Sequence, residues 1–147
     1  SIKTRHRVCL SVCFPMGSLF EHTVHPTYLR LNYQDSLAIS DESGRDAWTA
    51  VGRLCEESGR AKVLIETPGI DGPPDTMSAF ESGRVLSEHT MGLSIAICCV
   101  GERLDELTMF FKTVAQNRGV RLEFFFDSES ARQWLDVDTG ENAAVNR

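Results

Sequence analysis

Three carboxylates stand close together in the sequence, at the end of a short apolar run. Glu66 closes the run 62–66, and Asp71 and Asp75 follow it in a loop rich in Gly and Pro. If the run is a strand of an open α/β sheet, these side chains gather at the carboxyl edge, where such sheets bind their ligands. They can bind a cation or a polar ligand there, although a solvated acidic loop is the simpler interpretation.

Other residues that carry chemistry show none of the usual spacings. The four histidines do not fall into a metal-binding pattern, and Gly69 and Gly72 lack the Lys-Ser/Thr of a phosphate-binding P-loop. An odd number of cysteines without regular spacing does not describe a disulfide framework. These are Cys9, Cys13, Cys55, Cys98 and Cys99. We therefore expect no metal, no cofactor and no enzymatic activity, and we expect buried free thiols in a cytoplasmic protein.

The composition limits the kinds of partner. Of the 147 residues, 41% are hydrophobic, enough for the core of one domain, and the net charge is −6. An acidic chain is poorly suited to bind nucleic acid or an anionic membrane surface, because both require clustered Lys and Arg. The apolar run 93–100 is too short to cross a membrane. We expect neither nucleic-acid binding nor membrane insertion.

The element that must position these residues is the run 93–100, Leu-Ser-Ile-Ala-Ile-Cys-Cys-Val. It is apolar at nearly every position, which is typical of a strand buried on both faces of a mainly parallel sheet. The predicted strands are 28–33, 37–40, 62–66, 93–100 and 120–126, and the predicted helices are 45–58, 76–91, 103–118 and one that Asp127 or Ser128 caps. The apolar face of helix 45–58 is formed by Trp48, Val51, Leu54 and Cys55, and that of helix 76–91 by Met77, Phe80, Val85 and Leu86. We predict an α/β fold, a mixed five-stranded sheet with an N-terminal antiparallel hairpin, parallel strands and four helices.

The two ends of the chain lie outside this pattern. Residues 1–26 are predicted to be an N-terminal extension outside the fold. A basic stretch before a short apolar run is typical of a signal peptide, but we prefer Met16 as the native start, with residues 1–15 an upstream translated extension. Residues 27–136 form the predicted domain. Residues 137–147 are polar without a periodic face, which predicts a flexible tail.

The closing segment carries a resemblance to a known family. Residues 120–135 predict a strand that runs into an Asp, followed by a helix in which Ala131, Trp134 and Leu135 form the pattern Ala-x-x-Trp-Leu. This ending and the order of elements resemble the SpoIIAA-like family, small bacterial domains of the STAS type that are related in fold to CRAL-TRIO lipid-binding domains. The resemblance covers about residues 26–136 and implies a STAS-like fold.

The resemblance also implies a function. The best-understood relatives are anti-sigma-factor antagonists, which bind a partner kinase and are switched by phosphorylation of a Ser that follows an Asp at a helix start. A phosphate there meets free N–H groups and changes the charge of a docking surface. The matching place here is Asp75–Thr76, although the family's Asp-Ser-Ser/Thr-Gly run is absent, and either residue can equally be a plain helix cap. The implied partner or phosphoswitch surface consists of Thr67, Asp71, Asp75, Thr76 and Ser78.

A group of phenylalanines offers an alternative. Two adjacent Phe in the predicted helix 103–118 and three in the predicted strand 120–126 cannot all face one side. They fill the core, or some of them form a homodimer surface or a ligand pocket between that helix and the sheet. The predicted pocket residues are Phe80, Cys98, Phe110, Phe111 and Phe124.

These observations lead to one main prediction and one alternative. The main prediction is a non-enzymatic bacterial domain of regulatory or protein-interaction type, which binds an unknown protein or a second copy of itself. The alternative is a carrier or sensor of a small apolar, amphiphilic or lipid-like ligand.

Overall fold

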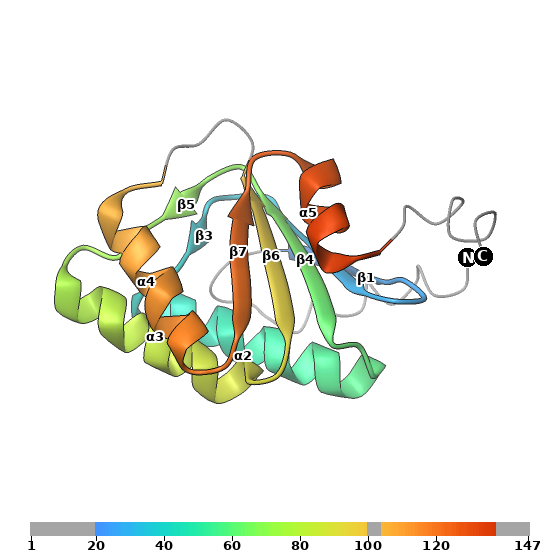
Figure 1. Ribbon diagram of the computed structural model, residues 1–147, viewed down its shortest axis with the longest axis horizontal. Coiled ribbons are helices and arrows are strands. Elements are labelled where there is room, and N and C mark those ends of the chain that lie inside the picture. Colours follow the sequence, from blue (N-terminus) through green and yellow to red (C-terminus); the bar gives the residue numbers. More distant parts are fainter. Residues whose placement is uncertain (1–19, 100–103, 138–147) are drawn as a thin grey trace.

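The computed structural model describes residues 20–99 and 104–137, which form four helices and a mixed five-stranded sheet, as predicted (Figure 1). The strands are β1 (Phe20–Val24), β2 (Leu29–Tyr33), β3 (Leu37–Ala38), β4 (Lys62–Thr67), β5 (Ile70–Asp71), β6 (Ser94–Cys99) and β7 (Arg121–Phe125). The helices are α2 (Asp41–Ser58), α3 (Thr76–Thr90), α4 (Glu106–Asn117) and α5 (Ser128–Leu135). No helix in the described part of the chain combines the length and the apolar character that a bilayer crossing requires.

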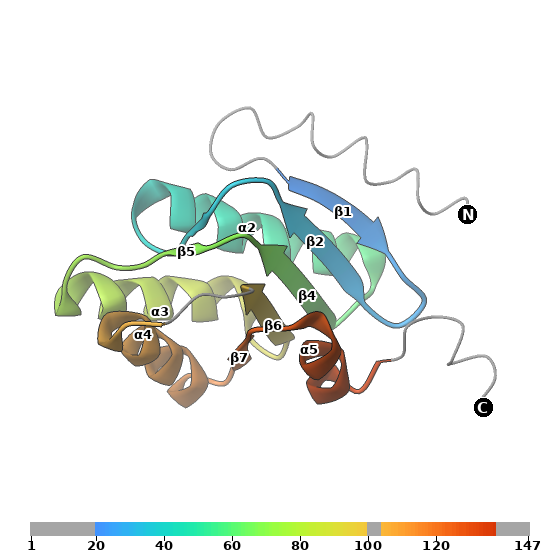
Figure 2. The same ribbon diagram turned by 90° about the horizontal axis from the view of Figure 1, so that it is seen from above.

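The main sheet has the strand order β1-β2-β4-β6-β7. β1 and β2 are antiparallel, and the other neighbouring pairs are parallel. Helices α2, α3 and α4 cover one face of the sheet, and α5 lies against the other (Figures 1 and 2). The carboxyl ends of the four parallel strands therefore meet at one edge, where α2 and α3 begin.

The buried side chains form one cluster on each face of the sheet. The larger cluster lies under three helices and includes Trp48 and Phe111, whose rings stack with their centroids 5.9 Å apart. The smaller cluster lies under α5 and includes Leu64, Ala96 and Cys98. All six residues of β6 are buried, which confirms the prediction of a strand covered on both faces.

The N-terminal hairpin differs from the predicted one. β1 pairs with β2, so residues 20–24 are an edge strand of the sheet and not part of an extension. The segment 37–40, predicted to pair with 28–33, instead supplies β3, which pairs in parallel with β5 outside the main sheet. The backbone N–H of Leu37 donates to the carbonyl of Gly69 at 2.9 Å, so the segment after β2 pairs with the loop that follows β4 and does not form a hairpin with β2. The sequence signal for β1 was the spacing of Phe20 and His22, which are both buried.

Three helices begin after an aspartate that caps them. The carboxylates of Asp75, Asp105 and Asp127 accept hydrogen bonds of 2.7–2.8 Å from the backbone N–H three residues further on. The predicted capping roles of Asp75 and Asp127 are thereby confirmed. Helix α2 begins at Asp41, four residues earlier than predicted, and Asp41 itself has a left-handed backbone conformation with φ 64°.

Helix α3 packs against α4 through small side chains. Its buried residues include Ser82 and Gly83, whereas Met77 and Phe80, predicted for its apolar face, are exposed. A Cβ atom on Gly83 would lie only 2.8 Å from the Cβ of Val114. Val85 and Leu86 of the same predicted face are buried, whereas Met77 and Phe80 lie outside because close helix contact selects small residues for the interface.

Candidate functional site

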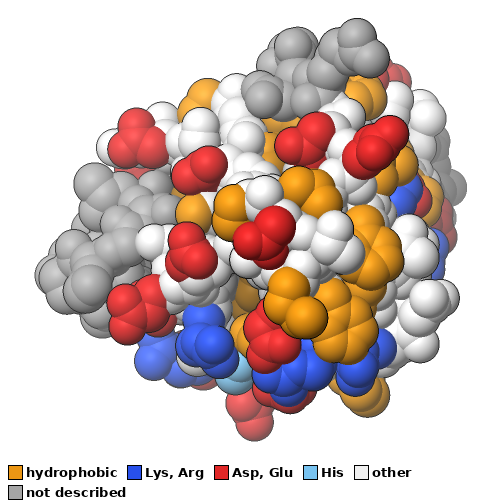
Figure 3. All heavy atoms as spheres, turned by 90° about the vertical axis from the view of Figure 1, so that its left-hand side faces the viewer, with side chains coloured by type: hydrophobic (Ala, Val, Ile, Leu, Met, Phe, Trp, Pro, Cys, Tyr) orange, Lys and Arg blue, Asp and Glu red, His pale blue; other side chains and the backbone are white. Residues whose placement is uncertain are grey.

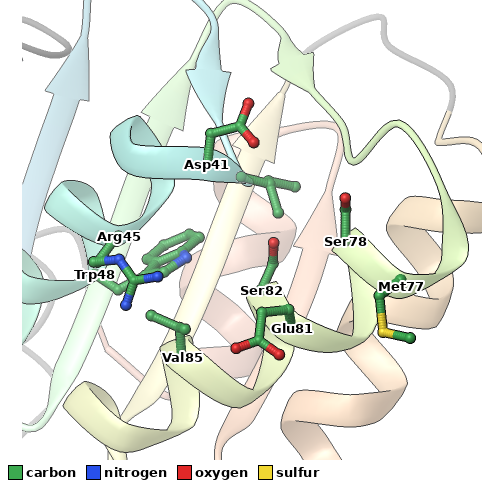
Figure 4. Close-up of a pocket in the computed structure, with 9 residues that line it drawn as sticks. Asp41, Arg45, Trp48, Met77, Ser78, Glu81, Ser82 and Val85 are labelled. Atoms are coloured by element: carbon green, nitrogen blue, oxygen red, sulfur yellow. The ribbon is translucent and has the colours of Figure 1, made fainter.

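A pocket opens between the first turns of α2 and α3, at the carboxyl edge of the sheet (Figure 4). Its volume is about 350 Å³, within the range of small-molecule sites. The apolar part of its wall is formed by Ile39, Trp48, Met77 and Val85. The polar part is formed by Asp41, Arg45, Ser78, Glu81 and Ser82. Because eight of these nine residues belong to α2 or α3, the approach of the two helices sets the width of the pocket.

Trp48 supplies a buried polar group to this pocket. Its side chain is 0% exposed, and its indole nitrogen Nε1 has no hydrogen-bond partner among the described residues. An indole N–H can only donate, and leaving a buried donor unpaired costs roughly 1–3 kcal/mol. Figure 4 shows the nitrogen on the side of the ring that faces the pocket. The floor of the pocket therefore contains one unused donor, which the surrounding side chains cover.

A pair of hydroxyl groups fixes the start of α2 against α3. Ser82 Oγ donates to Ser40 Oγ at 3.0 Å, and both residues are buried. The turn into α2 is tight, because a Cβ atom on Gly44 would lie 2.0 Å from the carbonyl oxygen of Ile39. The end of the pocket at which α2 begins is therefore held in place by backbone packing and by a buried hydrogen bond.

Charged side chains of both signs surround the opening. Arg84 forms ion pairs with Glu81 and Glu88 on the same helix. The hydrogen bond from Arg84 lowers the pKa of the Glu81 carboxyl, and the charges of Arg84 and Arg45 add to the effect. Glu81 is therefore ionised at neutral pH. Asp41 and Arg45 provide one charge of each sign from α2.

The five residues of the predicted partner surface lie in different environments. Thr67 is buried, and its hydroxyl bonds to backbone carbonyls of the adjoining loops, so it is not a surface residue. Asp71 is exposed and belongs to β5. Asp75 and Thr76 are exposed at the start of α3, and Ser78 is half-buried and lines the pocket. The structure thus brings three of the five together at the N-terminus of α3.

The five residues of the predicted apolar pocket do not line one cavity. Phe111 and Phe124 are buried between α4 and the sheet and fill that space themselves. Cys98 lies on the opposite face of the sheet, under α5, because successive side chains of a strand alternate. Phe80 and Phe110 are exposed on the helices.

A groove does run between α4 and the edge strand β7. Its volume is about 500 Å³, and Phe124 is the one residue of the predicted pocket that lines it. Its other lining residues are Leu104, Met109, Lys112, Glu123 and Phe126. Lys112 and Glu123 pair with each other at 2.7 Å, so the charged groups of this groove are already satisfied.

Large apolar side chains are exposed on α3 and α4. Met77 is 72% exposed and Phe80, one turn later, 38%, while Met109 and Phe110 of α4 are 41% and 36% exposed. We call these four residues the α3–α4 patch. The guanidinium of Arg118 lies over the ring of Phe80, 5.7 Å from its centroid. Figure 3 faces the end of the molecule where α3 begins and shows hydrophobic side chains gathered together, with acidic side chains above and among them and Lys or Arg side chains along their lower border.

Glu66 does not join Asp71 and Asp75 in a cation site. It lies on the face of the sheet under α5, where it accepts hydrogen bonds from Arg30 Nε at 2.8 Å and from Ser128 Oγ at 2.7 Å. Among the residues that the structure describes, no three His, Cys, Asp or Glu side chains are grouped to hold a metal ion. The role of Glu66 that the structure supports is to tie α5 to the sheet.

The cysteines in the described ranges are free and buried. Burial raises the pKa of the Cys55 thiol to about 11, and burial also raises the pKa of Cys98. Both side chains are therefore neutral thiols at pH 7, which makes them poor nucleophiles. Cys9 and Cys13 lie outside the described residues.

The pocket residues Arg45, Trp48 and Ser82 were not predicted as a site. The helical pattern assigned Trp48 to the core, which is correct for its ring, but a pattern cannot show that its nitrogen lacks a partner. The available signal was Gly44, one turn before Trp48, because a glycine inside a helix marks a close approach of another segment.

Comparison of the chain with known proteins gives no further identification. No family model, no curated protein and no solved structure matches it.

Proposed function

We propose that this protein is a non-enzymatic regulatory domain that binds another protein through the α3–α4 patch and the adjoining start of α3. The observation that carries the proposal is the exposure of four large apolar side chains on two neighbouring helices. Exposed apolar groups that lie together are characteristic of interaction surfaces. The charged side chains of both signs around the hydrophobic ones in Figure 3 favour a partner whose apolar groove has a rim of mixed charge.

The resemblance to the SpoIIAA-like family supports the same proposal. The five-stranded mixed sheet with four helices agrees with the fold that the resemblance implies. Thr76 is exposed next to the capping carboxylate of Asp75, so a kinase could reach its hydroxyl. A phosphoryl group there would add negative charge beside Met77 and so change the docking surface. The buried free thiols fit a reducing compartment such as the cytoplasm.

The test is affinity capture from cells of the source organism, with matched variants of the full chain as bait. Phe80→Asp places a charge in the patch, whereas Met91→Asp places the same charge at an exposed apolar residue at the other end of α3. We expect a protein that wild type and Met91→Asp retain in stoichiometric amount and that Phe80→Asp loses, with unchanged circular dichroism. Thr76→Glu is expected to change the amount retained.

Two outcomes would contradict the proposal. Equal retention by all variants would place the contact elsewhere on the molecule. A dimer in sedimentation velocity that Phe80→Asp dissociates would assign the patch to self-association. For the carrier alternative, Phe111 fills the interior between α4 and the sheet, so an apolar ligand would have to bind in the groove between α4 and β7.

A further inference from the structure

The pocket between α2 and α3 contains a hydrogen-bond donor that has no acceptor among the described residues. The fully buried Trp48 Nε1–H needs an acceptor, and the described residues supply none. Ser82 lies in the same wall, and because its hydroxyl hydrogen is used on Ser40, its oxygen remains free to accept. The occupant of the pocket must therefore present an acceptor atom to Trp48.

The charges around the opening narrow the class of ligand. Arg45 lines the pocket, and Figure 4 shows its guanidinium beside the indole ring. A carboxylate is the acceptor that both groups favour, because hydrogen bonds to an ionised acceptor are the stronger ones. Glu81 lines the same pocket and would repel a second negative charge, but it would attract an ammonium group, whereas Figure 4 shows the Asp41 carboxylate on the opposite side and directed away.

The apolar wall of the pocket indicates that the rest of the ligand is apolar. Ile39, Val85 and the ring of Trp48 are buried and offer a surface on which an aliphatic or aromatic side chain can pack. Met77 at the opening is largely exposed and free to close over such a group.

We propose that the pocket between α2 and α3 binds a free α-amino acid with an apolar side chain. Its carboxylate pairs with Arg45 and accepts from Trp48 Nε1 when the side chains that cover this nitrogen move aside, and its ammonium group lies toward Glu81. This inference does not rest on the protein-interaction role, although Met77 belongs to both the pocket and the α3–α4 patch.

The test uses the two tryptophans of the chain as reporters. In a ¹⁵N–¹H correlation spectrum, each indole N–H gives one signal, and the variants Trp48→Phe and Trp134→Phe assign them. Trp134 lies in α5, on the other face of the sheet, and serves as the internal control. The full chain is titrated to millimolar concentration with L-leucine, L-methionine and L-phenylalanine. Parallel titrations use 4-methylpentanoate and isoamylamine, which retain the apolar group of leucine with only one of its two charges.

We expect at least one amino acid to shift the Trp48 signal saturably without moving the Trp134 signal. Arg45→Met should weaken binding by about tenfold, as loss of a charge-assisted hydrogen bond predicts, whereas Arg53→Met, two turns further along α2, should not. Both arginines are exposed, so neither change threatens the fold. Trp48→Phe should weaken binding similarly, measured by calorimetry.

Three results would overturn the inference. One is the absence of any saturable shift of the Trp48 signal, which would mean that the pocket holds only water. Another is equal binding of 4-methylpentanoate, which would remove the role of the ammonium group. The third is an undiminished affinity in Arg45→Met. None of these measurements involves a protein partner, so failure here is distinguishable from failure of the proposed function.

Discussion

Gly52 lies at a close contact between α2 and α3. A Cβ atom on this residue would sit 2.3 Å from the carbonyl oxygen of His89 and 3.3 Å from its carbonyl carbon, whereas ordinary contact begins near 3.4 Å. The obstacle is backbone and not a flexible side chain. Gly52→Ala therefore forces the two helices apart locally by about 1 Å, a gap that forfeits a quarter to a half of the dispersion energy of the atoms concerned.

The expected change in the free energy of unfolding of Gly52→Ala is the difference between two opposing effects. Overpacking of a tight contact costs about 1–3 kcal/mol, and alanine in place of glycine inside a helix returns up to about 1 kcal/mol. We expect the free energy of unfolding to fall by about 1–2 kcal/mol, which corresponds to a decrease in Tm of roughly 4–8 °C for a domain of this size.

Urea denaturation followed by circular dichroism measures this change. Glu57→Ala, on the exposed surface of the same helix, should stay within about 0.5 kcal/mol of wild type. Removal of the imidazole in Gly52→Ala/His89→Ala should give no rescue, because the clash is with the backbone of His89. A Gly52→Ala protein as stable as wild type, or rescue by His89→Ala, would refute the reasoning.

Three further predictions concern titration and ion pairing. Hydrogen bonds from backbone N–H groups lower the pKa of the three capping aspartates, so their stabilisation is present above the ordinary Asp pKa and is lost as the pH falls through the lowered values. Replacing all three by Asn should flatten the decrease in the free energy of unfolding below about pH 4. Burial raises the pKa of Cys55 from 9.0 to about 11. The contribution of the neutral thiol to the free energy of unfolding is therefore present below pH 9 and is lost as the pH rises toward 11. Cys55→Ala should reduce the decrease in the urea midpoint over this alkaline range. A double-mutant cycle with Arg30→Met and Glu66→Gln should give a coupling free energy of about 0.5–1 kcal/mol, because the Arg30 side chain is 40% exposed.

Local patterns predicted the fold class well. The uninterrupted apolar run that became β6 and the stripe Trp48, Val51, Leu54 and Cys55 of α2 are properties of neighbouring residues, and all of these side chains are buried. The hairpin was missed because the sequence contains several short alternating segments and does not say which of them pair. Leu37 pairs with Ile70 of β5, more than thirty residues away in the sequence.

Most of the candidate site could not be predicted from the sequence. Asp75 was predicted as a cap because capping depends on residues within one turn. The orphan nitrogen of Trp48 depends on where α3 lies relative to α2, which follows from Gly44, Gly52 and Ser82 acting together. The exposure of Met77 and Phe80 has the same origin, since small residues occupy the helix contacts that larger ones would otherwise fill.

The order of strands in the sheet bears on how the chain is made. Each strand of the main sheet lies beside the one synthesised before it, from β1 to β7. A growing chain can therefore extend the sheet in the order of translation, with three helices arriving in turn on one face. The other face of the sheet is covered last, because Leu64, Ala96 and Cys98 pack under α5, the last of the described helices. Until these eight residues have been synthesised and have folded, the nascent protein presents an open apolar surface on that face of the sheet.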